Sequence, residues 1–202
     1  MLQLFAEHTQ QLASALEKTA DFHQQVLAVV EHLKEAFDNN KTVYIAGNGG
    51  SATLAQHLSD EMVGRYKGDR RPYPVVALTA DSAVLTCIGN DYGYDQVFSR
   101  QIGALGKEGD VFIALSTSGN SKNILKAAVA ARERGLTVIA FTGKQGTLKD
   151  LADYAITTPG DTTARIQERD LHAIHLICEA FEDPSLLASS FHESPEITPT
   201  AL

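Results

Sequence analysis

His57 and Glu61 are the first side chains of this sequence whose types and spacing could perform chemistry. They stand four residues apart in QHLSDE, residues 56–61, within a helical hydrophobic pattern, so they share one face of a helix. An imidazole and a carboxylate on one face can hold a transition metal or act as acid and base. A solvated surface pair is the commoner role of such residues, and Asp60, on a neighbouring face, fits a cap or a salt bridge.

A further imidazole follows near the C-terminal end, in the segment ARIQERDLHAIHL, residues 164–176. His175 stands among apolar residues, which predicts that it faces inward or lies at an interface. Gln167 precedes it by eight residues, about two helical turns, so both side chains can point toward one cleft. A histidine that is satisfied within the core is the alternative interpretation.

The glycine-rich segment GNGGS, residues 47–51, joins a predicted strand to a predicted helix. Its glycines let backbone N–H groups approach a ligand, and a helix N-terminus favours an anion. A plain tight turn would use the same glycines. The segment lacks the ending of a P-loop. It formally matches a dinucleotide fingerprint at Gly47, Gly49 and Ala52, but Asp81 lies 34 positions after Gly47 rather than about 20, which argues against nicotinamide binding.

The segment STSGNS, residues 116–121, precedes another predicted helix and carries three serines and one threonine around a glycine. Hydroxyls and N–H groups at a helix N-terminus form a neutral phosphate cradle. A helix N-cap accounts for one hydroxyl, whereas four hydroxyl residues within six positions exceed what a cap requires. We therefore expect a second phosphate-binding loop here.

Predicted strands and helices alternate along the chain and position these segments. Residues 2–38 predict one or two amphipathic helices, ended by Asn39 and Asn40. The alternation predicts an α/β fold with a central parallel sheet flanked by helices on both faces. Ligands of such sheets bind at the carboxyl ends of strands, where GNGGS, STSGNS and TGKQG all lie. Strands are expected at 42–46, 73–79, 110–116, 137–142 and 154–158, and further helices at 52–66, 122–134 and 163–181.

The composition narrows the function classes. The chain has 202 residues with 17 basic and 25 acidic side chains, a formal net charge of −8. One domain is expected at this length, and the acidic balance argues against a general binder of nucleic acids or anionic membranes. Cys87 and Cys178 form neither a disulfide framework nor a zinc cluster, and they fit a reducing cytoplasm. Neither a membrane span nor a signal peptide is expected.

Four segments together carry a resemblance to a known family: GNGGSATLAQHLSDEMVGRY, IGNDYGYDQVFSRQ, GKEGDVFIALSTSGNSKNI and ARIQERDLHAIHL. With them the chain resembles the sugar isomerase (SIS) domain family, and within it the phosphoheptose isomerases, from the N-terminal helices to about Phe181. The resemblance implies a three-layer sandwich with a flavodoxin-like parallel sheet. Residues 1–183 are then a single SIS domain whose N-terminal helices, 2–38, pack in the oligomer, and residues 184–202 are a flexible tail.

The resemblance further implies a cytoplasmic homotetramer with shared active sites, which acts on a small sugar phosphate and binds neither nucleic acid nor membrane. The implied reaction converts D-sedoheptulose 7-phosphate into D-glycero-D-manno-heptose 7-phosphate through an enediol. That reaction is the first step toward the ADP- or GDP-activated heptose of lipopolysaccharide and other surface glycans.

The resemblance also implies roles residue by residue. Glu61 and His175 match the catalytic base and acid, and one zinc ion per subunit is expected at His57, Glu61, Gln167 and His175. A glutamine is an unusual zinc ligand, so we expect a weak, exchangeable metal site. The expected substrate contacts are Asn48, Gly49, Gly50, Ser51, Arg65, Asn90, Asp91, Ser116, Thr117, Ser118, Ser121 and Gln167.

Two positions depart from patterns within the family. Ala164 stands where some members have Asp, and Asp170 stands where others have His. A related class of SIS proteins binds the DnaA replication initiator and is not an isomerase. It supplies the alternative function, a non-catalytic module that binds DnaA or senses a sugar phosphate. That class lacks the second histidine, whereas this chain keeps Glu61 and His175, so we expect an enzyme.

Overall fold

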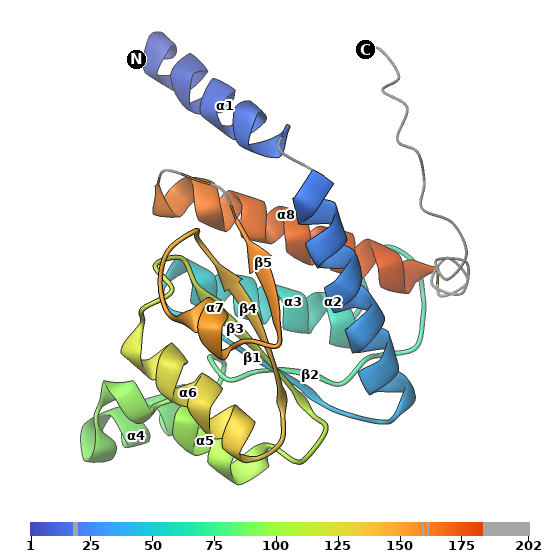
Figure 1. Ribbon diagram of the computed structural model, residues 1–202, viewed down its shortest axis with the longest axis vertical. Coiled ribbons are helices and arrows are strands. Elements are labelled where there is room, and N and C mark those ends of the chain that lie inside the picture. Colours follow the sequence, from blue (N-terminus) through green and yellow to red (C-terminus); the bar gives the residue numbers. More distant parts are fainter. Residues whose placement is uncertain (18–19, 159, 161, 184–202) are drawn as a thin grey trace.

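The computed structural model describes residues 1–17, 20–158, 160 and 162–183, and the expected tail, 184–202, lies outside this described part. Figure 1 shows a sheet enclosed by helices, with the first helix standing apart. In chain order the elements are α1 (Leu2–Leu16), α2 (Ala20–Asp38), β1 (Val43–Ala46), α3 (Gly50–Val63), β2 (Val75–Ala77), α4 (Ser82–Tyr92), the 3-10 helix η1 (Tyr94–Gln96), α5 (Ser99–Leu105), β3 (Val111–Ser116), α6 (Lys122–Glu133), β4 (Thr137–Thr142), α7 (Leu148–Leu151), β5 (Tyr154–Thr157) and α8 (Thr163–Glu182).

The five strands form one parallel sheet in the order β2-β1-β3-β4-β5. The chain therefore winds outward in both directions from β1 and β3, and the crevice at the carboxyl ends of these two neighbours is the topological switch point. Ala46 of β1 pairs in register with Ala114 of β3. The segments that follow these strands, 47–51 and 116–121, consequently emerge side by side at one edge of the sheet.

Alternating side chains of the strands build two hydrophobic cores. Val43 and Ile45 of β1 pack beneath α2, α3 and α8, whereas Tyr44 and Ala46 pack on the opposite face with α4, α5, α6 and α7. Strands covered on both faces are apolar throughout, which is why β3 is buried at all six positions. The resulting three layers confirm the expected α/β fold with a flavodoxin-like sheet.

The structure corrects two details of the predicted elements. The second strand has three residues, Val75–Ala77, instead of the expected 73–79, because the Tyr73 N–H bonds to the Met62 carbonyl and Pro74 has no N–H to donate. The helices α4, α5 and α7 were not predicted. They are short, and α4 contains Gly89 and several β-branched residues, so its packing against the core rather than local propensity determines it.

Helix α1 is attached to the rest of the molecule by polar contacts. None of its residues is buried, and it projects away from the body in Figure 1. The Arg165 guanidinium of α8 donates to the His8 carbonyl at 2.8 Å, and Arg169 donates to the Ala15 carbonyl. The exposed apolar side chains of α1 are Met1, Leu2, Leu4, Phe5 and Leu16.

Within the described part of the chain, the helices are too short or too polar for any of them to cross a membrane.

Candidate active site

The loop between β1 and α3 presents backbone groups at the switch point. Gly49 occupies the N-cap position of α3 with φ of +55°, a conformation that glycine adopts without strain. Since it has no side chain, the first N–H groups of α3 receive no side-chain cap. Ser51, one residue into the helix, is buried at 4% exposure. The loop therefore offers N–H groups, a hydroxyl and the positive end of a helix dipole.

The loop between β3 and α6 lies beside it and has a similar character. Ser116 is buried and its Oγ donates to Oγ of Ser121 at 3.1 Å. Ser121 is the N-cap residue of α6, yet its side chain makes no capping hydrogen bond, so the cap interpretation fails for this residue. Thr117 is half-buried and Ser118 is exposed. Two helix N-termini whose N-cap residues make no side-chain cap thus meet at the switch point, and α6 begins with the basic residue Lys122.

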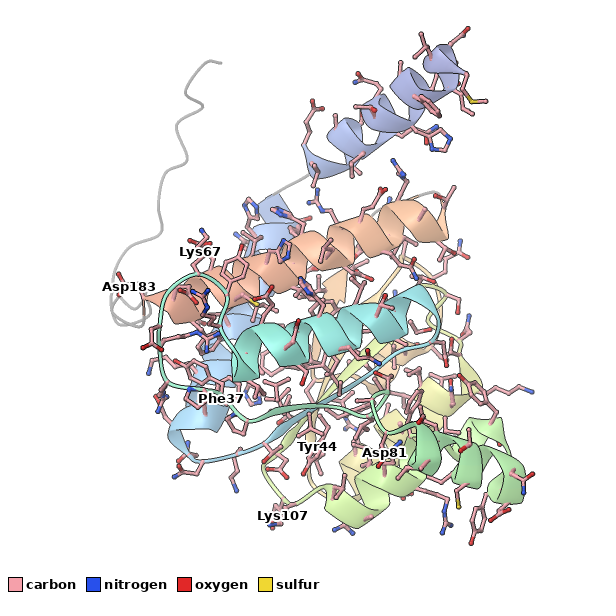
Figure 2. All side chains as sticks on the ribbon, turned by 180° about the vertical axis from the view of Figure 1, so that it is seen from behind. Phe37, Tyr44, Lys67, Asp81, Lys107 and Asp183 are labelled. Carbon is pink, nitrogen blue, oxygen red and sulfur yellow. The ribbon has the colours of Figure 1, made fainter. Side chains whose placement is uncertain are left out.

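The proposed acid/base residues come together from α3 and α8. The Nε2 atoms of His57 and His175 lie 3.0 Å apart, although the residues are 118 positions apart in sequence. The Glu61 Oε1 atom lies 3.7 Å from Nε2 of His57, and these side chains are 18% and 33% exposed. The His175 ring also lies against Tyr66, with ring centroids 5.6 Å apart. The two helices run side by side in Figure 2, and His175 is half-buried between them, as expected for a side chain that faces inward or lies at an interface.

The donor set fits a divalent metal at one side of His57. Two imidazole nitrogens 3.0 Å apart are close enough to share one ion, and two histidines with one glutamate form a donor set typical of catalytic zinc. Asp60 belongs to the same group of possible ligands, which lie within 4.8 Å of one another. That group consists of His57, Asp60 and Glu61 and does not include His175. The Oδ1 atom of Asp60 faces Nδ1 of His57 at 3.6 Å, on the other side of the ring from Nε2. Asp60 therefore suits orientation of the ring rather than a place on the same ion.

Gln167 links the helix pair to the first loop. Its Nε2 donates to Oγ of Ser51 at 3.4 Å, and its amide lies 2.6 to 2.9 Å from where a Cβ on Gly50 would stand. Only a glycine at position 50 leaves room for this side chain. In the structure Gln167 contacts the 47–51 loop, and its expected role as a metal ligand stays a prediction.

Three expected substrate contacts are exposed side chains near the ends of α3 and α4. Arg65 is exposed beyond the end of α3, where its guanidinium donates to the Lys67 carbonyl at 3.3 Å. Asn90 and Asp91 are exposed near the end of α4, where Nδ2 of Asn90 donates to Oδ1 of Asp91 at 2.7 Å. These hydrogen bonds do not involve His57 or His175.

Two further polar residues at the crevice escaped sequence reasoning. Asn123 is buried at 4% exposure and exchanges two hydrogen bonds with Asn48 at 2.8 and 2.9 Å. The Tyr94 hydroxyl donates to the same Asn48 side chain at 3.0 Å. Both residues stand within the quoted motifs, STSGNSKN and NDYGY. Their partner could not be inferred because it lies far away in sequence.

Asp170 places a buried carboxyl group in the layer that carries the site. The Thr158 hydroxyl donates to its Oδ1 at 2.6 Å, while its Oδ2 has no hydrogen-bond partner among the described residues. Burial raises the pKa of Asp170 to about 7, and the hydrogen bond from Thr158 opposes that rise. A carboxyl group that is buried away from water favours its neutral form.

Comparison with known proteins places the chain in a family. Residues 5–143 match the model of the SIS domain. A phosphoheptose isomerase of Geotalea daltonii is 48% identical over 78% of this chain and 83% of its own length. The chain belongs to the phosphoheptose isomerases of the SIS domain family. As a member of this family, the protein is an enzyme of the isomerase class.

Solved structures of phosphoheptose isomerases have the same fold. The enzyme from Francisella tularensis matches with a TM-score of 0.83 and 31% identity, over 88% of this chain and 95% of that one. The enzyme from Neisseria gonorrhoeae matches with a TM-score of 0.77 and 38% identity, over 90% and 96% of the two chains. Each of these matches covers more of the chain than the 5–143 segment that matches the SIS domain model.

Proposed function

We propose that the protein converts D-sedoheptulose 7-phosphate into D-glycero-D-manno-heptose 7-phosphate. The observation that carries this proposal is the convergence of His57, Glu61 and His175 from two helices, with the imidazole nitrogens 3.0 Å apart, beside two loops suited to an anion. The names of the relatives agree with this substrate. The role of the product as a precursor of activated heptose for surface glycans, and the cytoplasmic location, are further predictions.

The phosphate binds between the two loops at the switch point. The N-terminal N–H groups of α3 and α6 point toward it, and an anion at a helix N-terminus gains from the helix dipole. The sugar lies between these loops and the helix pair, within reach of Asn48, Gly49 and Gly50. The hydroxyl groups that complete the cradle belong to Ser51, Ser116, Thr117, Ser118 and Ser121.

The isomerisation moves one proton between neighbouring carbons. Glu61 removes a proton from C1 of the open-chain ketose and returns it to C2, which requires a carboxylate at the edge of solvent, as its 18% exposure provides. His175 delivers a proton to the oxygen on C2 and accepts one from the oxygen on C1, since an imidazole can act as both a general acid and a general base. The intermediate between these transfers is a cis-enediol.

His57, Glu61 and His175, together with Gln167, would hold one divalent ion, and zinc is the ion that the family predicts. When bound, such an ion polarises the substrate oxygens and stabilises negative charge that develops on them. Asp60 orients the His57 ring from its Nδ1 side, 3.6 Å away.

The assembly that we propose is a homotetramer with shared active sites. Helix α1 has no buried residue and turns its apolar side chains outward, so contact with another copy would remove them from water. Arg65, Asn90 and Asp91 are exposed in the single chain, so they are accessible to a neighbouring subunit whose site they would complete. Light scattering of the purified protein tests the tetramer.

The reaction is tested by incubating the purified protein with D-sedoheptulose 7-phosphate and following the aldose product by NMR. We expect turnover that falls after treatment with a chelator and returns with added zinc. No turnover with or without zinc would contradict the reaction, and turnover that survives the chelator would contradict the metal alone. A panel of other ketose phosphates measures how strictly the enzyme selects the seven-carbon sugar.

A further inference from the structure

The side chain of Asn48 is held by residues from two other elements. Its Nδ2 donates to Oδ1 of Asn123 at 2.9 Å, and Nδ2 of Asn123 donates back to Oδ1 of Asn48 at 2.8 Å. The Tyr94 hydroxyl donates to the same Oδ1 at 3.0 Å. Asn123 belongs to the first turn of α6 and Tyr94 to η1. Three separate segments therefore meet in one network of hydrogen bonds at the crevice.

The orientation of this network follows from a backbone group. The N–H of Ile124 donates to the side chain of Asn123 at 3.0 Å, and a backbone N–H can only donate, so the atom that it meets is the oxygen. The nitrogen of Asn123 therefore faces Asn48. The atom of Asn48 that receives it is in turn an oxygen, because two donors would repel each other. The polarity of the Asn48 amide is thus set from α6.

The remaining hydrogen-bonding capacity of Asn48 is a donor. An amide side chain has two N–H protons and an oxygen with two lone pairs. Asn123 and Tyr94 occupy the oxygen, and Asn123 receives one of the two protons. One N–H of Asn48 is left for a ligand, and Asn48 is half-buried at the carboxyl end of β1.

We propose that Asn123 and Tyr94 are positioning residues, which fix Asn48 as a hydrogen-bond donor toward a carbonyl or hydroxyl oxygen of the sugar. This inference rests on the proposed function, because it takes Asn48 as a sugar contact. A freely rotating amide would present its oxygen as often as its nitrogen, and the network removes that wrong orientation before the ligand arrives.

A double-mutant cycle separates positioning from other roles. Asn123→Leu keeps a similar shape and adds no charge, but it frees the Asn48 amide to turn over, since the Tyr94 hydroxyl can donate or accept. We expect about tenfold weaker binding of sedoheptulose 7-phosphate, which corresponds to one strong hydrogen bond. On an Asn48→Ala background the same change should weaken binding less than about twofold. Additive effects of the two substitutions would overturn the inference.

Two further variants show whether weaker binding comes from lost positioning of Asn48 or from a folding defect. Tyr94→Phe removes one hydroxyl from an exposed side chain and should weaken binding about threefold, again only while Asn48 is present. Asn39→Leu removes an amide that bonds to the Glu35 carbonyl at the end of α2, ahead of the amino end of β1, and it should leave binding unchanged. Tyr94→Phe that weakens binding equally in both backgrounds would contradict a role through Asn48.

Binding of inorganic phosphate and of the sugar phosphate, together with hydrogen exchange of the Asn48 side chain, separates this inference from the proposed reaction. Inorganic phosphate should bind Asn123→Leu within about twofold of wild type, and an equal loss for phosphate and sugar phosphate would overturn positioning in favour of a damaged loop. If wild type binds the sugar phosphate without isomerising it, the proposed reaction is contradicted. The double-mutant cycle can still be measured, because it depends on binding alone. If wild type does not bind it, hydrogen exchange of the Asn48 side-chain amide decides: exchange should be faster in Asn123→Leu, and an unchanged rate overturns the inference.

Discussion

The strand-end loops and the α3–α8 helix pair contribute opposite kinds of groups to one site. The loops at 47–51 and 116–121 supply hydroxyls and backbone N–H groups at uncapped helix N-termini. The helix pair supplies His57, Glu61 and His175, all of which can carry a proton. On the proposed function, binding of the anion and transfer of protons are divided between the strand-end loops and the helix pair, so each can be altered separately.

This division also explains how a chain with a formal net charge of −8 can bind a phosphate. A cradle of N–H groups and hydroxyls needs no cluster of lysines, and its charge does not change with pH. The proposed proton-transfer groups lie in the α3–α8 helix pair, and Asp170 is a further titratable residue of α8. Four substitutions test this comparison.

Glu61→Gln should have the largest effect. Removal of the base should lower kcat by about 10³-fold, within the range for general acid–base catalysis, while inorganic phosphate binds within about twofold of wild type because the loops are unchanged. Steady-state kinetics and calorimetry measure the two quantities. Glu179→Gln, on the exposed end of α8 where Glu179 pairs with Lys67, is the matched control. A kcat within tenfold of wild type would mean that another group is the base.

Asp170→Asn should change stability in a manner that depends on pH. Burial raises the pKa of Asp170 from its ordinary 3.8 to about 7, so the folded state holds this proton more tightly than the unfolded chain does. The stabilisation from that proton is complete below about pH 4 and is lost as pH rises to about 7. At pH 8 the variant should therefore be more stable than wild type, by at most about 4 kcal/mol.

Thermal unfolding of Asp170→Asn and wild type at pH 5 and pH 8 measures this effect. The difference in Tm should be larger at pH 8 and should shrink toward pH 5. Asp69→Asn changes an exposed carboxylate and should show no such trend. Equal differences at both pH values would place the buried proton on another group.

Gly50→Ala tests the contact between the two regions. A Cβ at this position would lie 2.6 Å from Oε1 of Gln167, so the glutamine must move, whereas alanine itself favours the helix by up to about 1 kcal/mol. We expect kcat/KM to fall about thirtyfold (about 2 kcal/mol) with no loss of Tm. The same change at Gly103 in α5, where a Cβ would meet nothing within 4 Å, should leave activity intact. Equal activities of the two variants would show that Gln167 is not needed in its observed place.

Ser118→Ala should have the smallest effect and should act on binding alone. Loss of one hydroxyl from the cradle should raise KM about fivefold with kcat unchanged, as expected for one hydrogen bond of about 1 kcal/mol. Ser82→Ala, at the exposed start of α4, serves as the control. A fall in kcat with constant KM would contradict the division between the two regions.

Much of the scaffold could be predicted because its signals are local. The strand at 137–142 and the break after Asp38 were both predicted, since an apolar run and a pair of asparagines mark them. The short helices α4, α5 and α7 were not predicted, because packing against the second core determines them. In the site, the loops and the inward orientation of His175 followed from residue type and spacing.

What the sequence determined by itself was the alternation of strands and helices, the anion-binding loops and the types of side chain available for proton transfer. Each of these depends on neighbouring residues. Only the tertiary structure decided that His175 meets His57 across 118 positions, that Gln167 rests on Gly50, and that Asn48 is oriented from α6 and η1. The physical reason is that such contacts arise from packing of distant elements, and no local pattern encodes the partner of a hydrogen bond.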